Sequence, residues 1–289
     1  MSLDIFLVLA LLFAALLHAS WNALIKSGGD KSLDTALIHS LGLVFALPAL
    51  LWFGLPPAAA WPFIAASTLI HIAYYAALAG AYRYGDLGLT YPIMRGAAPL
   101  LVALVSSMLL DEPLSGPAWL GVIVLSAGVL LVGLARAGHN AAHAGHRRKA
   151  LGFALANAAI IASYTVIDGM GVRAAGNAFS YVAALFLFDG LPYMALVLWR
   201  AGPRRGEALR YMRARAALAL AGTAASLGSY GIALWAMMHA PVALVAALRE
   251  TSVIFAALIG TWVLGERFGW ARATGTALVV AGVVTLRFS

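Results

Sequence analysis

Long apolar runs alternate with short polar segments along almost the whole chain. Ten of these runs have about the 20 residues that an α-helix needs to cross the hydrocarbon core of a membrane. They cover residues 3–25, 33–54, 60–84, 87–110, 116–135, 150–172, 179–200, 214–238, 241–264 and 268–288. Helix-breaking sequences such as Leu55-Pro56-Pro57 and Ala201-Gly202-Pro203 lie between them. The pattern predicts ten transmembrane helices joined mostly by short loops.

The composition supports a membrane protein and excludes several other classes. Hydrophobic residues make up 63% of the chain, charged residues only 10%, and the mean hydropathy is +0.91. A soluble domain carries about 25% charged residues, so a soluble globular protein, a disordered chain and a nucleic-acid-binding domain are excluded. The net charge of +8 comes from basic clusters between the apolar runs, which suit loops that face anionic membrane lipid. The chain has no cysteine, which excludes disulfides and thiol chemistry.

The two halves of the chain resemble each other. A shift of 154 positions places Arg95 on Arg249 and Glu112 on Glu266, and a polar gap of 14 residues at 136–149 separates the halves. Each half contains five spans, and an odd number of spans inverts the second half relative to the first. We therefore expect an all-α integral membrane protein, with ten transmembrane helices in two inverted five-helix repeats around a central cavity.

The expected repeats are residues 1–135 and 150–289, joined by a cytoplasmic linker at 136–149. Fifteen of the 19 Lys and Arg residues lie in loops after odd-numbered spans, and only two lie in loops or ends on the opposite side. This bias places the odd loops in the cytoplasm and both termini in the periplasm of a bacterial inner membrane. Residues 1–4 show no basic segment, so we expect the first span to be a retained helix rather than a signal peptide.

Arg95, Arg249 and Glu250 are charged residues inside the predicted spans. Arg95 and Arg249 each follow the start of their span by eight residues, and Glu250 is adjacent to Arg249. Eight residues of helix rise about 12 Å, which places both arginines near the middle of the membrane. A charge there costs about 2.5–3.5 kcal/mol even on the most permissive scale. The three residues either face a water-filled cavity and bind charged groups of a substrate, or form an internal ion-pair network that fixes helix packing.

Other polar and aromatic residues occur within the same set of spans. An aromatic-walled pocket with a few hydrogen-bonding groups suits a small zwitterion, although tyrosine and tryptophan near span ends also form interfacial belts. Together with the three charged residues, the expected substrate-binding residues are His18, Trp21, Asn22, His71, Tyr75, Tyr91, Tyr164, Asp168, Tyr230 and Trp235.

Glycines spaced seven apart predict close helix packing in spans five and ten. Gly121 and Gly128 form one such pair, and Gly275 and Gly282 form the other. Small residues allow helix backbones to approach in lipid, so these two spans are expected to be structural.

No motif indicates an enzyme, a cofactor or a metal site. His139, His143 and His146 have helical spacing, but they lie in an Ala/Gly-rich segment with no carboxylate nearby, which favours a solvated linker. Metalloprotease, phosphate-loop and nucleophile-elbow patterns are all absent from the sequence. We expect no catalytic residue, no metal and no cofactor.

Short motifs at the ends of spans four and nine resemble a known family. Leu110-Asp111-Glu112 and Leu264-Gly265-Glu266, with Ala98-Pro99-Leu100 in span four, are similar to motifs of the EamA family in the drug/metabolite transporter (DMT) superfamily. Asp111 departs from the family's Gly-Glu pattern. Within the family the chain resembles YddG-type amino acid exporters. The resemblance implies a central cavity formed by spans one, three, four, six, eight and nine, with spans five and ten at the periphery.

The leading hypothesis is an inner-membrane transporter that exports amino acids of broad selectivity, or similar small metabolites, by alternating access. The closest alternative is a carrier of another small metabolite, such as a drug, a phosphonate-related compound or a nucleotide sugar. A non-transporting membrane scaffold and a lipid-modifying membrane enzyme remain as alternatives of other classes. The expected partners are a small-molecule substrate and membrane lipid, and we expect a monomer.

Overall fold

The computed structural model describes residues 3–84, 87–134, 144–262 and 269–289. The side chains of 75–84, 87–89, 91, 134 and 144–147 also lie outside the described part. All regular elements in these ranges are helices, as predicted. They are α1 (Ile5–Lys26), α2 (Lys31–Ser40), α3 (Gly42–Phe53), η1 (Ala58–Ala60), α4 (Trp61–Tyr84), α5 (Leu87–Leu109), α6 (Gly116–Leu134), α7 (Ala144–Ala175), α8 (Ala178–Ala201), η2 (Gly202–Arg204), α9 (Arg205–Met237), α10 (Val242–Arg249), α11 (Ser252–Trp262) and α12 (Trp270–Arg287).

The helix ends follow local sequence signals. The side chains of Asp4, Asp30 and Asn177 accept hydrogen bonds from backbone amides in the first turns of α1, α2 and α8. At the other end, α3 stops at Gly54, whose φ of 79° is a conformation that side chains with a Cβ rarely adopt. The predicted breaks at Leu55-Pro56-Pro57 and around Gly202 are confirmed as helix boundaries.

Each predicted span coincides with one helix or with two consecutive helices, but several boundaries differ from the prediction. The spans expected at 33–54 and 241–264 are each broken, into α2 and α3 and into α10 and α11. Helices α7 and α9 begin six and nine residues earlier than expected, at Ala144 and Arg205. Their added turns are rich in Arg, Lys, Glu and Ala, which favour helix but not lipid, so hydropathy marked the membrane boundary rather than the helix boundary.

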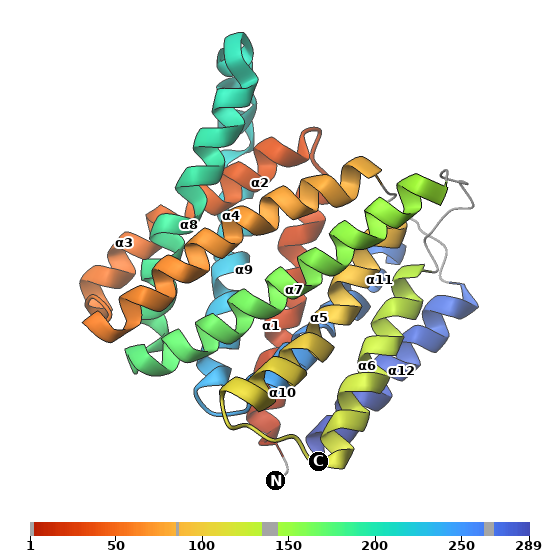
Figure 1. Ribbon diagram of the computed structural model, residues 1–289. Helices are drawn as coiled ribbons and strands as arrows, with labels where there is room; N and C mark the ends of the chain where they lie inside the picture. Colours follow the sequence, from red (N-terminus) through yellow and green to blue (C-terminus); the bar gives the residue numbers. More distant parts are fainter. Residues whose placement is uncertain (1–2, 85–86, 135–143, 263–268) are drawn as a thin grey trace.

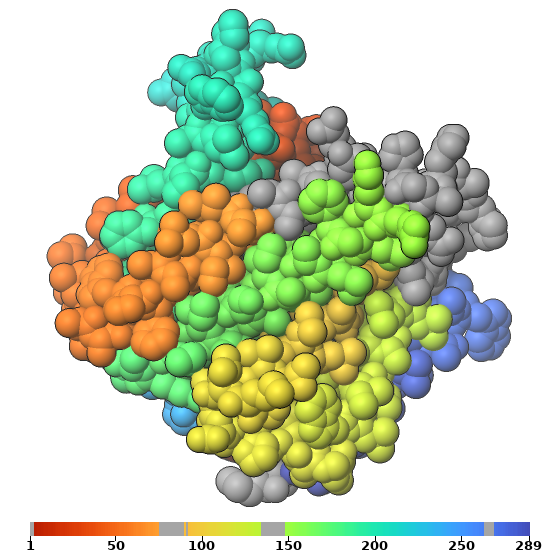
Figure 2. All heavy atoms as spheres, viewed as in Figure 1, coloured from red at the N-terminus to blue at the C-terminus, as the bar shows by residue number. Residues whose placement is uncertain are grey.

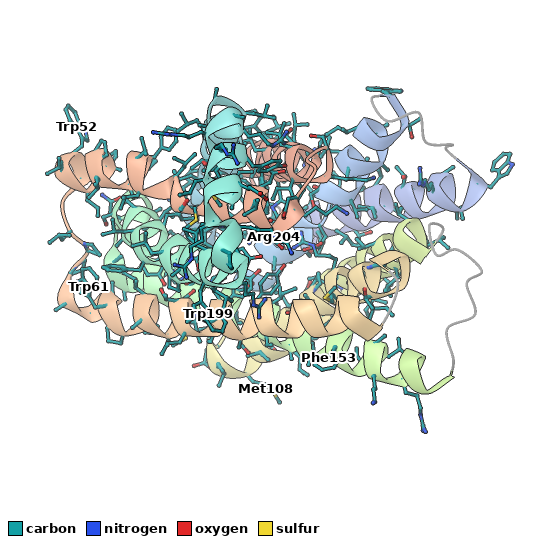
Figure 3. All side chains as sticks on the ribbon, turned by 90° about the horizontal axis from the view of Figure 1, so that it is seen from above. Trp52, Trp61, Met108, Phe153, Trp199 and Arg204 are labelled. Carbon is teal, nitrogen blue, oxygen red and sulfur yellow. The ribbon has the colours of Figure 1, made fainter. Side chains whose placement is uncertain are left out.

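The outer surface of the helix bundle is apolar, as a membrane protein requires. Seven helical stretches in the described ranges are long and apolar enough to cross a membrane: 5–26, 31–53, 92–109, 116–133, 148–175, 178–237 and 242–262. Trp52 is 84% exposed and Met108 is 73% exposed, and both project outward with Phe153 in Figure 3. Exposed apolar area on this scale indicates contact with lipid. The chain is therefore a multi-pass membrane protein, while the number of ten spans stays a prediction.

Helices from the two halves of the chain intermix throughout the bundle. Helix α4 packs along α7, and α1 packs along α9, while α3 lies against α8 and α6 against α12. On the face shown in Figure 2, α7 (green) lies between α4 (orange) and the end of α5 (yellow). Both termini lie at the same end of the molecule in Figure 1, and the hairpin of α8 and α9 projects at the opposite end. An inverted repeat predicts this pairing of helices, and the repeat itself stays a prediction.

Helices α6 and α12 meet at their glycines, which confirms the predicted close packing. A Cβ atom on Gly128 would lie 2.7 Å from the carbonyl oxygen of Gly275, and one on Gly275 would lie 2.9 Å from that of Gly128. A Cβ on Gly282 would likewise lie 2.9 Å from the carbonyl oxygen of Gly121. Backbone atoms cannot move aside easily, so these positions exclude any larger residue.

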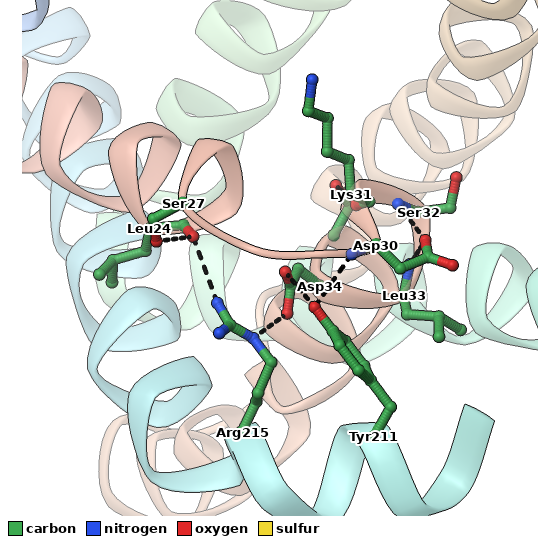
Figure 4. A network of polar contacts seen from close by, with 10 residues as sticks. Leu24, Ser27, Asp30, Lys31, Ser32, Leu33, Asp34, Tyr211 and Arg215 are labelled. Carbon is green, nitrogen blue, oxygen red and sulfur yellow. Dashed lines mark hydrogen bonds and ion pairs between the residues drawn. The ribbon is translucent and has the colours of Figure 1, made fainter. Parts of the chain in front are cut away.

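A polar cluster joins α9 to the turn between α1 and α2 (Figure 4). The Arg215 Nε atom lies 2.6 Å from Asp34 Oδ1, and the Tyr211 hydroxyl donates to Asp34 Oδ2 at 3.0 Å. The Tyr211 oxygen also accepts from the backbone N–H of Asp30 at 3.1 Å. The cluster ties the start of the N-terminal half to the C-terminal half.

A second cluster joins α7, the α5–α6 connection and the start of α10. Arg173 lies 2.5 Å from Glu112 Oε1 and donates to the carbonyl oxygens of Met237 and Ala240. The other carboxylate oxygen of Glu112 accepts from the backbone N–H of Val242 at 2.9 Å. Glu112 therefore caps the start of α10 in the other half of the chain.

The glycine contact between α6 and α12 predicts a selective loss of stability. The substitution Gly128→Ala should lower the free energy of unfolding by about 1–3 kcal/mol, the usual cost of overpacking. Gly152→Ala is the matched control, because a Cβ on this glycine inside α7 has no neighbour within 4 Å. The control should be neutral or stabilising, since alanine favours helix over glycine by about 1 kcal/mol. Thermal unfolding of both variants in detergent would measure this difference, and equal stability would contradict the close contact.

Candidate functional site

The break between α10 and α11 places Arg249 and Glu250 inside the bundle. Around the break the backbone hydrogen bonds tighten to three-residue spacing, from Glu250 N to Ala247 O at 3.0 Å and from Val253 N to Glu250 O at 3.0 Å. Such tightened turns inside a helix often mark functional positions. Residues 242–248 before the break are all buried, so the charged pair follows a helix that lies in the interior.

Glu250 forms a buried ion pair with Arg95. The Arg95 Nε atom lies 2.9 Å from Glu250 Oε2, and the two side chains are only 12% and 7% exposed. The guanidinium group of Arg95 also lies 3.4 Å from His18 Nε2 on α1. The pair therefore connects α5 with the break after α10, and the positive charge of Arg95 is balanced by Glu250.

Arg249 lies over an aromatic ring instead of a carboxylate. Its guanidinium carbon is 5.1 Å from the centre of the Tyr230 ring, and among the described residues Arg249 forms no ion pair. The hydroxyl of Tyr230 in turn donates to Asp168, which also accepts from Tyr181 at 2.8 Å. Asp168 is fully buried, and these two phenols satisfy both of its carboxylate oxygens.

A small pocket lies between α5, α7 and α10, beside these charged groups. Its polar lining consists of Arg95, Tyr164, Thr165, Arg249 and Glu250. The pocket has room for about one water molecule, so the structure shows it closed around its own side chains. The lining carries two positive charges and one negative charge, which favours a ligand with an anionic group.

Two more of the expected residues approach this pocket. The ring of His71 stacks on that of Tyr164 with centroids 4.5 Å apart, and the ring of Trp21 meets that of His18 edge-on at 5.2 Å. These contacts bring nine of the expected residues together around the pocket. They are His18, Trp21, His71, Arg95, Tyr164, Asp168, Tyr230, Arg249 and Glu250. Their role in substrate binding stays a prediction.

The remaining expected residues have other surroundings. The amide of Asn22 donates to the carbonyl of His18 in its own helix at 2.8 Å, and Trp235 is 36% exposed with its ring against His239. The side chains of Tyr75 and Tyr91 lie outside the described residues.

The expected absence of a metal site can be examined only in part. The side chains of His139, His143 and His146 are not described. No group of three or more His, Asp or Glu side chains within the described ranges is arranged to hold a metal ion.

Several buried polar residues in the interior were missed by the sequence reasoning. Asp189 on α8 lies 3.7 Å from His39 on α2 and 3.8 Å from His71 on α4. Asp189 is an ionisable residue in the middle of a predicted span, so the rule applied to Arg95 would have found it. His39 is likewise an ionisable residue inside a predicted span. The partner of Glu112, Arg173, was counted only as a loop charge.

Comparison with known proteins gives one family and one fold. Residues 148–288 match the model of the EamA-like transporter family. This EamA-like region contains α8 to α12 and nearly all of α7, including Tyr164, Asp168, Arg249 and Glu250. A solved structure, described only as the crystal structure of a protein, has a TM-score of 0.75 and 20% identity over 97% of this chain and 96% of its own. No curated protein matches the chain.

The EamA-like model describes a family of transporters, and its match covers just under half of the chain. The EamA-like region supplies one half of the site, and α1, α4 and α5 supply His18, His71 and Arg95 from outside it. The likeness to the crystal structure extends over both halves and shows that the whole chain has a known fold.

The Arg95–Glu250 pair predicts strongly coupled effects of substitution. Removing either partner leaves a buried charge, so Arg95→Met or Glu250→Leu should each lower the free energy of unfolding by about 3–5 kcal/mol. The double variant should lose clearly less than the sum of the single losses. Unfolding in mixed detergent micelles would measure this, with Arg213→Met and Glu207→Leu on the exposed start of α9 as the control pair. Additive losses at Arg95 and Glu250 would contradict the coupling.

Proposed function

We propose that the whole chain is an EamA-type transporter of the bacterial inner membrane that exports amino acids by alternating access. The EamA-like region and the fold shared over both halves support a transporter built from the entire chain. The intermixed helices support a site between the two repeats, where transporters of this kind bind their substrates.

The proposal of an amino acid substrate rests on how the charges in the pocket are paired. Glu250 balances Arg95, whereas Arg249 faces the ring of Tyr230 and pairs with no described carboxylate. An uncompensated guanidinium deep in a membrane protein suits a substrate carboxylate, which it can bind with two hydrogen bonds. The carboxylate of Glu250 is available for the substrate ammonium group when the pocket opens.

The remaining walls of the pocket support broad selectivity. Beyond the charged groups the lining consists of Tyr164, Thr165 and apolar side chains from α5, α7 and α10. Aromatic and aliphatic surfaces provide contact area with little directional demand, and one methylene group changes binding by only about 1–3 kcal/mol. Several amino acids with different side chains should therefore compete with one another.

Counterflow in proteoliposomes tests the proposed function. Vesicles that contain the full-length protein and an unlabelled amino acid mixture should accumulate radiolabelled amino acids, whereas a nucleotide sugar or a cationic drug should not exchange. Exchange of a nucleotide sugar or a drug without amino acids would contradict the proposed substrate.

Arg249 provides the matched test of the site. Arg249→Gln should abolish counterflow, because the substrate carboxylate loses its cationic partner, while the protein stays monodisperse on size exclusion. Arg213→Gln is the control, since this arginine lies exposed on α9, and it should transport normally. Normal transport by Arg249→Gln would exclude the proposed role.

The proposed orientation has both termini in the periplasm. Fifteen basic residues lie on the side of the odd loops, which include the connections around the projecting α8–α9 hairpin. Alkaline phosphatase fused to the C-terminus should therefore be active, and a fluorescent protein at the same position should be dark. The reverse pattern would place the termini in the cytoplasm.

A further inference from the structure

A second buried polar cluster lies where α2, α4 and α8 meet. The carboxylate of Asp189 stands between two imidazoles, with Oδ2 3.7 Å from His39 Nδ1 and Oδ1 3.8 Å from His71 Nδ1. The side chain of Asp189 is 10% exposed and each histidine side chain is 14% exposed. Two imidazoles around one carboxylate form a group that changes charge when it takes up a proton.

The cluster lies deep within the spans that carry it. Asp189 is midway along α8, His71 is near the middle of α4, and His39 lies just before the break between α2 and α3. Gly190 lets the backbones approach there, because a Cβ on it would lie 2.3 Å from the carbonyl oxygen of His39. Ionisable groups at this depth are costly, and they often mark proton or ion pathways.

Asp189 is incompletely satisfied by its surroundings. Its Oδ1 atom is buried and accepts no hydrogen bond from a described residue, and both histidine contacts exceed hydrogen-bonding distance. His71 Nδ1 instead contacts the backbone oxygen of Ser67 at 2.9 Å. A buried carboxylate in this state gains most from binding a proton or from drawing in a protonated imidazole.

Two other carboxylates on the surrounding helices already have partners. Asp168 on α7 is bound by Tyr181 and Tyr230, and Asp34 on α2 is paired with Arg215 of α9. Further phenols on these helices are Tyr74 on α4, Tyr164 on α7, Tyr193 on α8 and Tyr211 on α9, whereas Lys31, Lys149, Arg200 and Glu207 lie exposed toward the helix ends, and α3 has no titratable residue.

Two lines of ring contacts connect the cluster to the pocket. On one side His71 stacks on Tyr164, which lines the pocket. On the other side the ring of His39 meets Trp21 at 5.8 Å, Trp21 meets His18, and His18 lies against Arg95. A movement of either imidazole therefore changes its contacts with the residues that lead to the pocket, which are Tyr164 on one side and Trp21 on the other.

We propose that Asp189, His39 and His71 form a proton-binding site whose loading is coupled to occupancy of the pocket, so that a proton enters as substrate leaves. A proton passes from water on one side of the membrane to the cluster and is released on the other side, and no other bond is made or broken. The coupling rests on the proposed transport function, whereas the proton-binding site does not depend on it.

Proton movement in proteoliposomes tests the coupling. With a pH-sensitive dye inside the vesicles, addition of an amino acid mixture should change the internal pH for the wild-type protein. Asp189→Asn should abolish this change and retain counterflow at equal pH, because exchange of one substrate for another needs no net proton transfer. Asp111→Asn, in the exposed α5–α6 connection, and His239→Gln, in the exposed turn after α9, are the matched controls and should behave as wild type. Wild-type counterflow without any proton movement would overturn the coupling.

Acid–base infrared difference spectra of the purified full-length protein test the proton site without any substrate. The wild-type protein and Asp111→Asn should show the same titrating carboxyl and imidazole bands, and Asp189→Asn should lack part of them. An unchanged spectrum for Asp189→Asn would overturn the site even where transport is intact. Absence of counterflow with a positive infrared result would instead contradict the proposed function alone. If Asp189→Asn is not monodisperse, His39→Gln replaces it and should lack part of the imidazole bands.

Discussion

The structure depends on one constraint, which is that each of three buried carboxylates within the membrane-spanning bundle needs an oppositely charged or polar neighbour. Three interior groups meet this constraint in different ways. Glu250 is paired with Arg95, Asp168 is bound by two phenols, and Asp189 stands between two imidazoles at a distance. The helices that supply these partners are in contact with one another, since α5 meets α10, α7 meets α8 and α9, and α8 meets α2 and α4. Water cannot replace a missing partner in hydrocarbon, so the polar contacts select the arrangement of the helices while dispersion forces hold them together.

Much of the architecture was predictable because the hydropathy of a segment indicates whether that segment lies in lipid or in water. The apolar runs located the helices, and the glycine spacing located the contact between α6 and α12. The breaks after Ser40 and Arg249 were not predictable, because no proline or glycine marks the second one and only a glycine follows the first. The early starts of α7 and α9 were missed for the opposite reason, since a helix continues into water where hydropathy has already fallen.

The site was predictable as a list of residues but not as a set of pairs. Ionisable residues inside spans identified Arg95, Arg249 and Glu250, and the structure adds that Glu250 joins Arg95 rather than the adjacent Arg249. Which arginine Glu250 pairs with depends on the turn at Glu250, because this turn directs the side chains of Arg249 and Glu250 toward different helices. Asp189 and His39 carried the same signal and were overlooked, whereas the caps that Glu112 and Arg173 form across the two halves depend on tertiary contacts that no local pattern encodes.

The glycine contact between α6 and α12 also bears on how the two halves of the chain can change over evolutionary time. Each excluded Cβ would meet a backbone atom of the other helix, so a larger residue on one helix cannot be accommodated by a smaller side chain opposite. Relief would require a shift of the whole backbone, and that shift would move Gly121, Gly128, Gly275 and Gly282 together. These four positions should therefore remain glycine or change in concert among related sequences, and substitution at one of them alone should be rare.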